Sequence, residues 1–265
     1  MIYRLTGATV RAVIVAILVM LPAFLLTGTT QSAIEFTRIL ATMGAVFVIY
    51  EYGFSSPSVI EFRYAAPYNR VRFLLLLILV LTPTYLISSL LDGHTVNGFL
   101  SNAARNGFAF MDFAYSPVAI VANTLAGDNL VLREIIGQAI ILNAIICLSF
   151  SLAFCISVML NFWQFGGENF NMWLNMPTYK SYNIHSLQSR LINSSFSSLL
   201  IACLIPIFGP TLADVVLSQG TVITPITIIW VIALWTYLPA MFLMRSVALA
   251  KVAMSRDDKA EWMPI

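Results

Sequence analysis

Few residues of this sequence are of types that bind metals or cofactors, and their spacing matches no known site. Cys147, Cys155 and Cys203 all lie within apolar runs, without CxxC or Cys/His spacing, so the sequence indicates neither a zinc site nor a disulfide framework. We expect these cysteines to act as small apolar packing residues. His94 and His185 lie in connecting segments, whereas a membrane b-type haem needs imidazoles within helices. The prediction is therefore no metal and no cofactor.

Catalytic motifs are likewise missing from the sequence. It contains no G-x-S-x-G elbow, no H-E-x-x-H and no nucleophile beside a histidine. Glu51 and Glu61 share one connection, but carboxylates that flank arginines are more typical of an ion-pair patch than of an acid–base pair. The sequence favours a non-enzymatic protein, and an integral-membrane enzyme is the third alternative.

The composition excludes a soluble fold. The 265 residues are 59% hydrophobic and only 10% charged, whereas soluble domains have about a quarter charged residues. The net charge of +2 is too small and dispersed for a nucleic-acid groove, so we expect no nucleic-acid partner. We predict one all-α, polytopic transmembrane helical bundle over residues 1–265, with the lipid bilayer as its surroundings.

Uncharged apolar runs predict about six spans, since a helix needs about 20 residues to cross the hydrocarbon. The predicted spans are 12–28, 39–50, 73–91, 135–160, 195–213 and 221–244. The second is short and must extend past Arg38 or Glu51, with the charged ends reaching the interface. The first also fits a signal peptide, because Arg4 and Arg11 precede it and small residues follow it.

The basic residues predict the orientation of these spans. With an inside N-terminus, 11 of the 14 Lys and Arg residues fall in inside segments, and only Arg38, Arg105 and Arg133 fall outside. Because Lys and Arg are retained on the cytoplasmic side, we predict that both termini are cytoplasmic.

The first inside connection, residues 51–72, is dense in aromatic residues, prolines and charge. Ser58 followed by Glu61 fits a capping box, which predicts a short interfacial helix over Val59–Tyr64 that ends before Pro67. One interpretation is an anchor of aromatic and arginine side chains at lipid headgroups. The other is a surface that docks a partner, because Tyr and Arg dominate interface energies; its candidate residues are Glu61, Arg63, Tyr64, Arg70 and Arg72.

The outside connection between residues 92 and 134 contains an apolar run that is too short to cross a membrane. Residues 107–126 fit an interfacial helix, with Ser116 as the N-cap and Pro117 at the first helical position. They also fit a re-entrant hairpin packed against the bundle. The sequence leaves both alternatives open.

The second inside connection, residues 161–193, mixes asparagines with aromatic side chains. This pattern is typical of an aromatic belt in which amide side chains cap turns. It also fits a polar lid over a headgroup or amphiphile site, with Trp163, Asn169, Trp173 and Asn175 as its candidate residues.

The predicted spans contain no Lys, Arg, Asp or Glu near their middles, which disfavours a proton-coupled pump. The fourth span has a polar face that includes Gln138, Asn143 and Ser151. We expect this face to form hydrogen bonds between helices, and the alternative is a narrow polar path. Pro206 and Pro210 should kink or open the fifth span, a feature found in transporters and in structural bundles alike.

Three segments of the connections resemble known sequences: Ser-Pro-Ser-Val-Ile-Glu-Phe-Arg at 56–63, Tyr-Ser-Pro-Val at 115–118 and Phe-Asn-Met-Trp-Leu-Asn-Met-Pro at 170–177. With the six-span layout, this pattern resembles uncharacterised polytopic inner-membrane proteins of alphaproteobacteria. The resemblance implies a multi-pass protein of the bacterial inner membrane and brings no functional residues with it.

We therefore expect an accessory, assembly or scaffold subunit of a larger membrane complex, with other membrane-protein subunits as partners. The alternative is a permease or carrier component for an apolar or amphiphilic molecule, such as a lipid or a quinone. A water-accessible central cavity lined by Asn143, Ser151 and the broken fifth span favours the carrier, whereas a filled core with an exposed aromatic flank favours the scaffold.

The topology can be tested by cysteine labelling in a background without native cysteines. An impermeant thiol reagent added from outside should modify a cysteine placed at Leu100 or Asp128, because the charge distribution puts both outside. A cysteine at Asn183 should stay unmodified until the membrane is opened. Outside labelling at Asn183 would contradict the six-span topology.

Overall fold

A computed structural model describes residues 2–53, 60–62, 65–94, 98–163, 175–179, 184–217 and 223–255. Every regular element within these ranges is helical, which confirms the all-α class. In chain order the elements are α1 (Ile2–Leu25), α2 (Gln31–Gly53), α3 (Ala66–Leu91), α4 (Phe99–Met111), α5 (Pro117–Ala126), α6 (Leu130–Met159), the 3₁₀ turn η1 (Pro177–Tyr179), α8 (Ile184–Leu217) and α9 (Pro225–Met254).

Six of these helices are long and apolar enough to cross a membrane, namely α1, α2, α3, α6, α8 and α9. The six predicted spans are confirmed, and the protein is a multi-pass membrane protein. The helices are longer than most of the uncharged windows because they continue into their charged flanks. In α2, the window 39–50 is extended at both ends, past exposed Arg38 and past Glu51.

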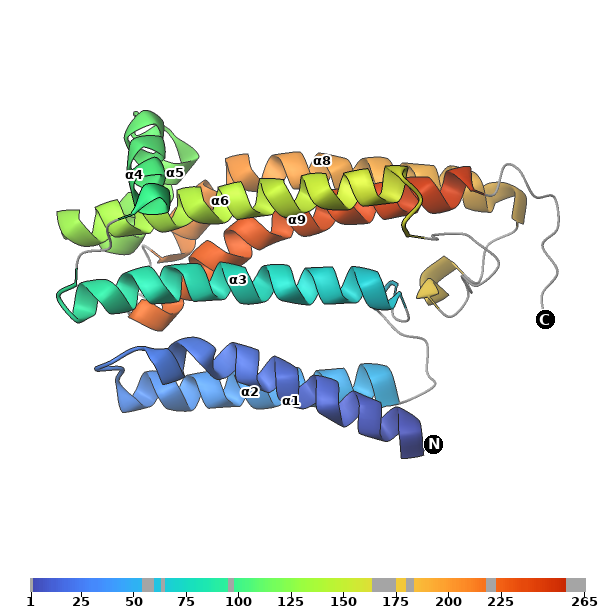
Figure 1. The fold of residues 1–265 in the computed structure, drawn as a ribbon, viewed down its shortest axis with the longest axis horizontal. Helices are drawn as coiled ribbons and strands as arrows, with labels where there is room; N and C mark the ends of the chain where they lie inside the picture. The colour runs from blue at the N-terminus through green and yellow to red at the C-terminus, as the bar shows by residue number, and fades with distance from the viewer. Residues whose placement is uncertain are drawn as a thin grey trace.

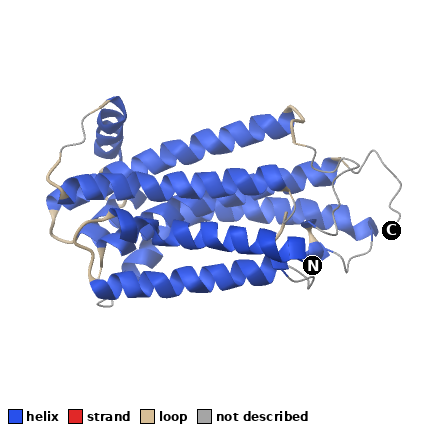
Figure 2. Cartoon of the chain, turned by 60° about the horizontal axis from the view of Figure 1, so that its bottom comes forward, coloured by secondary structure: helices blue, strands red, loops and turns tan. Residues whose placement is uncertain are grey.

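The long helices lie side by side with α9 at the centre, packed against α3, α6 and α8. Figure 1 shows the α1–α2 hairpin along one side of α3, and Figure 2 shows from another direction that the long helices run alongside one another. The beginning of α1 and the end of α9 lie at the same end of the bundle. An even number of spans therefore places both ends of the helical bundle on one side of the membrane.

Burial differs between the centre and the edge of the bundle. In α9, Ile229, Ile232 and Leu249 have no exposed surface, because three helices surround it. In α2, by contrast, four residues are buried, and one of them is the small residue Ala41. This helix packs along α1. Small residues allow such close helix packing in lipid. The other sides of α2 expose large apolar side chains, as a lipid-facing helix must.

The two short helices α4 and α5 lie at the end of the bundle opposite the termini, and Figure 1 shows α4 steeply inclined to the long helices. The predicted start of α5 is confirmed, with Ser116 at the N-cap and Pro117 in the first turn. The Ser116 hydroxyl makes no capping bond and is buried without a partner. Within residues 107–126, α5 is a short helix that packs against α6 and α8.

Hydrogen bonds attach α5 and the segment before it to the long helices α6 and α8. Arg133 of α6 donates to the Asp112 carboxylate and, over 2.5 Å, to the Asn123 side-chain oxygen of α5. Thr124 of α5 donates to the Asp214 carboxylate of α8 over 2.8 Å. The hydrogen bonds from Arg133 hold the pKa of Asp112 below its ordinary value. This pair therefore stays charged at pH values where an ordinary aspartate begins to take up a proton.

Close packing of α4 against α6 depends on Gly137. A Cβ atom at this position would lie 2.3 Å from the ring of Phe108, whose side chain is buried in the contact between the two helices. Glycine is therefore required here for its lack of a side chain, and the ring occupies the space.

We expect Gly137→Ala to displace the Phe108 ring and loosen α4, at a cost of roughly 1 to 3 kcal/mol, the usual range for overpacking. Thermal unfolding in detergent should shift to lower temperature, and amide exchange should accelerate within residues 99–111. Gly44→Ala is the control, because its Cβ would lie an ordinary 3.6 Å from Val15. Equal behaviour of the two variants would contradict this account of α4.

Candidate functional site

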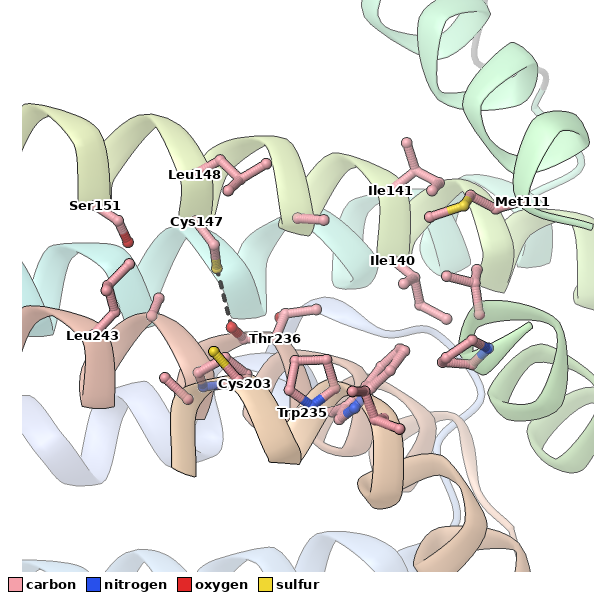
Figure 3. A pocket seen from close by; sticks show the side chains of 18 of the residues that line it. Met111, Ile140, Ile141, Cys147, Leu148, Ser151, Cys203, Trp235, Thr236 and Leu243 are labelled. Atoms are coloured by element: carbon pink, nitrogen blue, oxygen red, sulfur yellow. Dashed lines mark hydrogen bonds between the residues drawn. The ribbon is translucent and has the colours of Figure 1, made fainter. Parts of the chain in front are cut away.

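An apolar cleft of about 430 Å³ opens between α6, α8 and α9. Figure 3 shows Ile140, Cys147 and Ser151 of α6 facing Thr236 and Leu243 of α9 across it, with Cys203 of α8 at its other side. Pro117 and Val118 of α5 and Met111 of α4 close one end. We call this space the lateral cleft.

The cleft exists because α6 and α8 both pack against α9 but hardly touch each other. At one end α5 lies between them and contacts both. Toward the middle of the spans none of the described helices takes its place, and the space stays open. The lining residues of α8, such as Ala202 and Cys203, are near the middle of this helix, so the opening is at the depth of lipid chains.

Two prolines shape the wall of the cleft, Pro206 in α8 and Pro239 in α9. A proline has no backbone N–H, so the carbonyl four residues earlier loses its helical donor. These carbonyls belong to Ala202 and Trp235, which also line the cleft. Pro206, one of the two prolines expected to kink or open the fifth span, therefore lies beside the cleft, although α8 is one continuous helix over Ile184–Leu217. Helix α9 has a second proline at a similar depth.

The cleft has few polar atoms. The Trp235 indole nitrogen is buried without a hydrogen-bond partner. Its ring packs so closely on α8 that a Cβ at Gly209 would be 3.1 Å from this nitrogen. The Cys147 thiol donates to the Thr236 carbonyl over 3.2 Å, and Ser151 lies one turn further along α6. These groups offer a ligand isolated hydrogen bonds within a largely apolar surface.

The structure separates the residues of the predicted intramembrane polar face. Asn143 is fully buried, and its amide donates to the Leu79 carbonyl of α3 over 3.0 Å and to the Thr236 hydroxyl of α9 over 3.4 Å. Ser151 lines the lateral cleft, whereas Asn143 does not. The Gln138 amide donates to Glu134 of its own helix over 3.1 Å. One face of α6 thus supplies both a link between helices and part of the cleft wall.

The candidate docking residues of the first inside connection are in different surroundings. The Glu61 carboxylate forms two hydrogen bonds with Arg245 of α9, at 2.5 and 2.7 Å. Arg72 lies 5.2 Å from the centre of the Tyr68 ring and donates to the Met241 sulfur. Arg70 is exposed. The remaining two candidates, Arg63 and Tyr64, lie outside the described residues. Residues 60–62 form a bend and a turn and not the interfacial helix predicted over Val59–Tyr64. The other residues of that predicted helix lie outside the described ranges.

Two of the candidate lid residues, Trp163 and Asn175, pack against the end of the bundle at which the first inside connection lies. Asn175 is buried, and its backbone carbonyl accepts a hydrogen bond from the Phe62 backbone N–H over 2.6 Å. Trp163 packs edge-on against Phe154, with ring centres 4.9 Å apart. The other two candidates, Asn169 and Trp173, lie outside the described residues. The two inside connections therefore contact each other, which the sequence did not indicate.

Sequence reasoning missed Trp235 and Arg245. No sequence pattern pointed to Trp235, because its role depends on packing against Gly209, which is distant in sequence. The sequence weakly indicated that Arg245 and Glu61 pair, because the predicted topology puts both on the inside and their charges are opposite. In the part of the chain that the structure describes, no three His, Cys, Asp or Glu side chains are grouped as metal ligands.

Comparisons with models of protein families, with curated proteins and with solved structures find no match to this chain.

Replacing Asn143 tests how much the α3–α6–α9 contact contributes. Asn143→Leu should lower the free energy of unfolding in detergent by roughly 0.6 to 2 kcal/mol, the range for interhelical hydrogen bonds in membrane proteins. Ser149→Ala is the control, because Ser149 is exposed on α6 and donates only within its own helix. A stability of Asn143→Leu equal to that of the control would show that the hydrogen bonds of Asn143 contribute nothing.

Proposed function

We propose that this protein is a non-enzymatic, multi-pass protein of the bacterial inner membrane that binds the hydrocarbon chain of a membrane lipid in the lateral cleft. The observation that supports the proposal most directly is the cleft itself, an open apolar site at the middle of the spans. The excess of basic residues in the predicted inside segments supports an inner-membrane topology with cytoplasmic termini.

The depth and chemistry of the cleft favour a hydrocarbon ligand. Its opening lies among residues that face lipid, such as Leu148, which is 69% exposed. Apolar chains surround the protein at this depth, and water is excluded. The volume of about 430 Å³ falls within the usual range of small-molecule sites, about 300 to 1,000 Å³.

The rim of the cleft disfavours a transmembrane helix of another protein as the occupant. Helices pack closely in membranes where small residues line the contact. Here the large side chains of Leu148 and Ile207 are exposed at the cleft, and they would hold a second backbone away. A flexible chain fits between such side chains. The cleft is apolar and Asn143 does not line it, so it is not the central cavity expected of a carrier path; it supports the ligand class of the carrier alternative, a lipid or a quinone-like amphiphile.

The accessory or scaffold role is the second candidate, and α2 is the observation that favours it. This helix packs along α1 and lies at the edge of the bundle, with Phe36, Met43 and Phe47 exposed. Such a face suits contact with another membrane-protein subunit. The two candidates are compatible, since the cleft and α2 are different surfaces.

The proposal can be tested by photo-cross-linking in nanodiscs with a phosphatidylcholine that has a diazirine at the middle of one acyl chain. Adducts should concentrate on residues 140–151 and 199–207, because both segments line the cleft. Ala144→Phe should remove most of this labelling by filling the space. Ile145→Phe is the matched control, since Ile145 is exposed on the same helix and does not line the cleft.

Two results would contradict the proposal. One is labelling spread evenly over all lipid-facing helices, including residues 36–47 of α2. The other is equal labelling in the Ala144→Phe and Ile145→Phe variants.

A further inference from the structure

A second pocket, also about 430 Å³, lies near the beginning of α8 and is polar. We propose that this pocket binds a phosphate group, supplied by a lipid headgroup or by a soluble phosphate ester. Its lining residues are Glu61, Thr178, Tyr179, Arg190, Asn193, Ser194 and Ser197. We call it the headgroup pocket.

The charges around the headgroup pocket favour an anion. Glu61 is the acidic residue of its described lining, and both of its carboxylate oxygens accept hydrogen bonds from Arg245. The charge of Glu61 is thereby balanced within the protein. Arg190 adds a second guanidinium, so these three groups together have a net positive charge. Arginine is the side chain best matched to phosphate, because its planar donors can bind two oxygens at once.

Neutral hydrogen-bond donors complete the lining. Thr178 and Ser194 have hydroxyl groups and Asn193 has an amide, all of which can donate to phosphate oxygens. The Tyr179 hydroxyl interacts with Ser194 and Arg245, and burial raises the pKa of Tyr179. This hydroxyl therefore stays protonated at neutral pH. Arg245 also donates to Ser198, so the wall next to the pocket is fixed by several bonds.

The depth of the pocket matches that of lipid phosphates. Arg190 lies in the first turns of the α8 span, which covers Ser186–Val215. Arginine side chains at such positions reach the headgroup layer. The predicted orientation places this end at the cytoplasmic surface, where phosphorylated headgroups and soluble phosphate esters are both available.

The headgroup pocket is separate from the lateral cleft. Residues 190, 193, 194 and 197 line the pocket, and residues 199, 202, 203 and 206 line the cleft. At about 100° per residue these two sets lie on nearly opposite sides of α8. One lipid does not fill both sites in this arrangement, and the inference does not rest on the proposed function.

Native mass spectrometry of the full chain in neutral detergent tests the inference. The Ala144→Phe background is used throughout, so that the filled cleft contributes no lipid. The probes are phosphatidic acid, a diacylglycerol with the same chains, and glycerol 3-phosphate. Phosphatidic acid should be retained well above diacylglycerol, because only the phosphate differs between them.

Arg190→Gln should lower this retention about tenfold, as expected for the loss of a charge-assisted partner. Ser197→Asp should act similarly by repulsion, and because Ser197 is exposed this change should not disturb folding. Arg70→Gln changes an exposed arginine in the first turns of α3 that is not among the described lining residues of the pocket; it is the control and should retain phosphatidic acid normally.

The three probes distinguish the source of the phosphate. Retention of phosphatidic acid alone supports a lipid headgroup, whereas binding of glycerol 3-phosphate with equal dependence on Arg190 supports a soluble ester. Equal retention of phosphatidic acid and diacylglycerol would overturn the inference. So would unchanged retention in both the Arg190→Gln and Ser197→Asp variants. Neither result would bear on lipid-chain binding in the lateral cleft, which the cross-linking experiment tests separately.

Discussion

The position of α5 between α6 and α8 is the constraint on which the lateral cleft depends. Helices in lipid gain stability from close packing, so α6 and α8 would be expected to close on each other over α9. The short helix α5 prevents this closure at one end, where most of its residues are buried between these helices. Hydrogen bonds from Arg133 to Asn123 and from Thr124 to Asp214 attach it to both neighbours. Beyond α5 the same separation leaves a space that the protein does not fill.

The opposite end of the bundle is organised by polar contacts. There the backbone of the first inside connection is hydrogen-bonded to that of the second, through Phe62 and Asn175. The bidentate pair between Glu61 and Arg245 joins the first connection to α9. A partly buried ion pair of this kind is weak evidence for stability, because removing charges from water is costly. The clearer effect of the pair is on position. It holds the first inside connection beside α8, where Glu61 lines the headgroup pocket. Helix α8 thus has the apolar lateral cleft on one side and the polar headgroup pocket on the other.

Much of the fold could be predicted from the sequence, because bilayer thickness and the absence of water dictate the length and polarity of each span. All six spans were predictable for this reason, and the start of α5 was predictable from Ser116 as an N-cap and Pro117 at the first helical position. The packing of α5 between two distant helices was not, since it depends on contacts between segments far apart in the chain. Asn143 and Ser151 illustrate the limit: the sequence placed both on one polar face of the fourth span, but only the packing of α3 and α9 separates Ser151 in the cleft from Asn143 in the core. The pairing of Glu61 with Arg245 was equally beyond sequence pattern, although the predicted topology placed both at the same end.

The most direct measurement of the central claim is a cryo-electron microscopy structure of the protein in nanodiscs of bacterial lipids, at a resolution that shows acyl chains. The account predicts α6 and α8 held apart by α5, with elongated density that enters from the bilayer and lies against Cys203, Trp235 and Pro239. Direct packing of α6 against α8, with protein side chains filling the space, would contradict it.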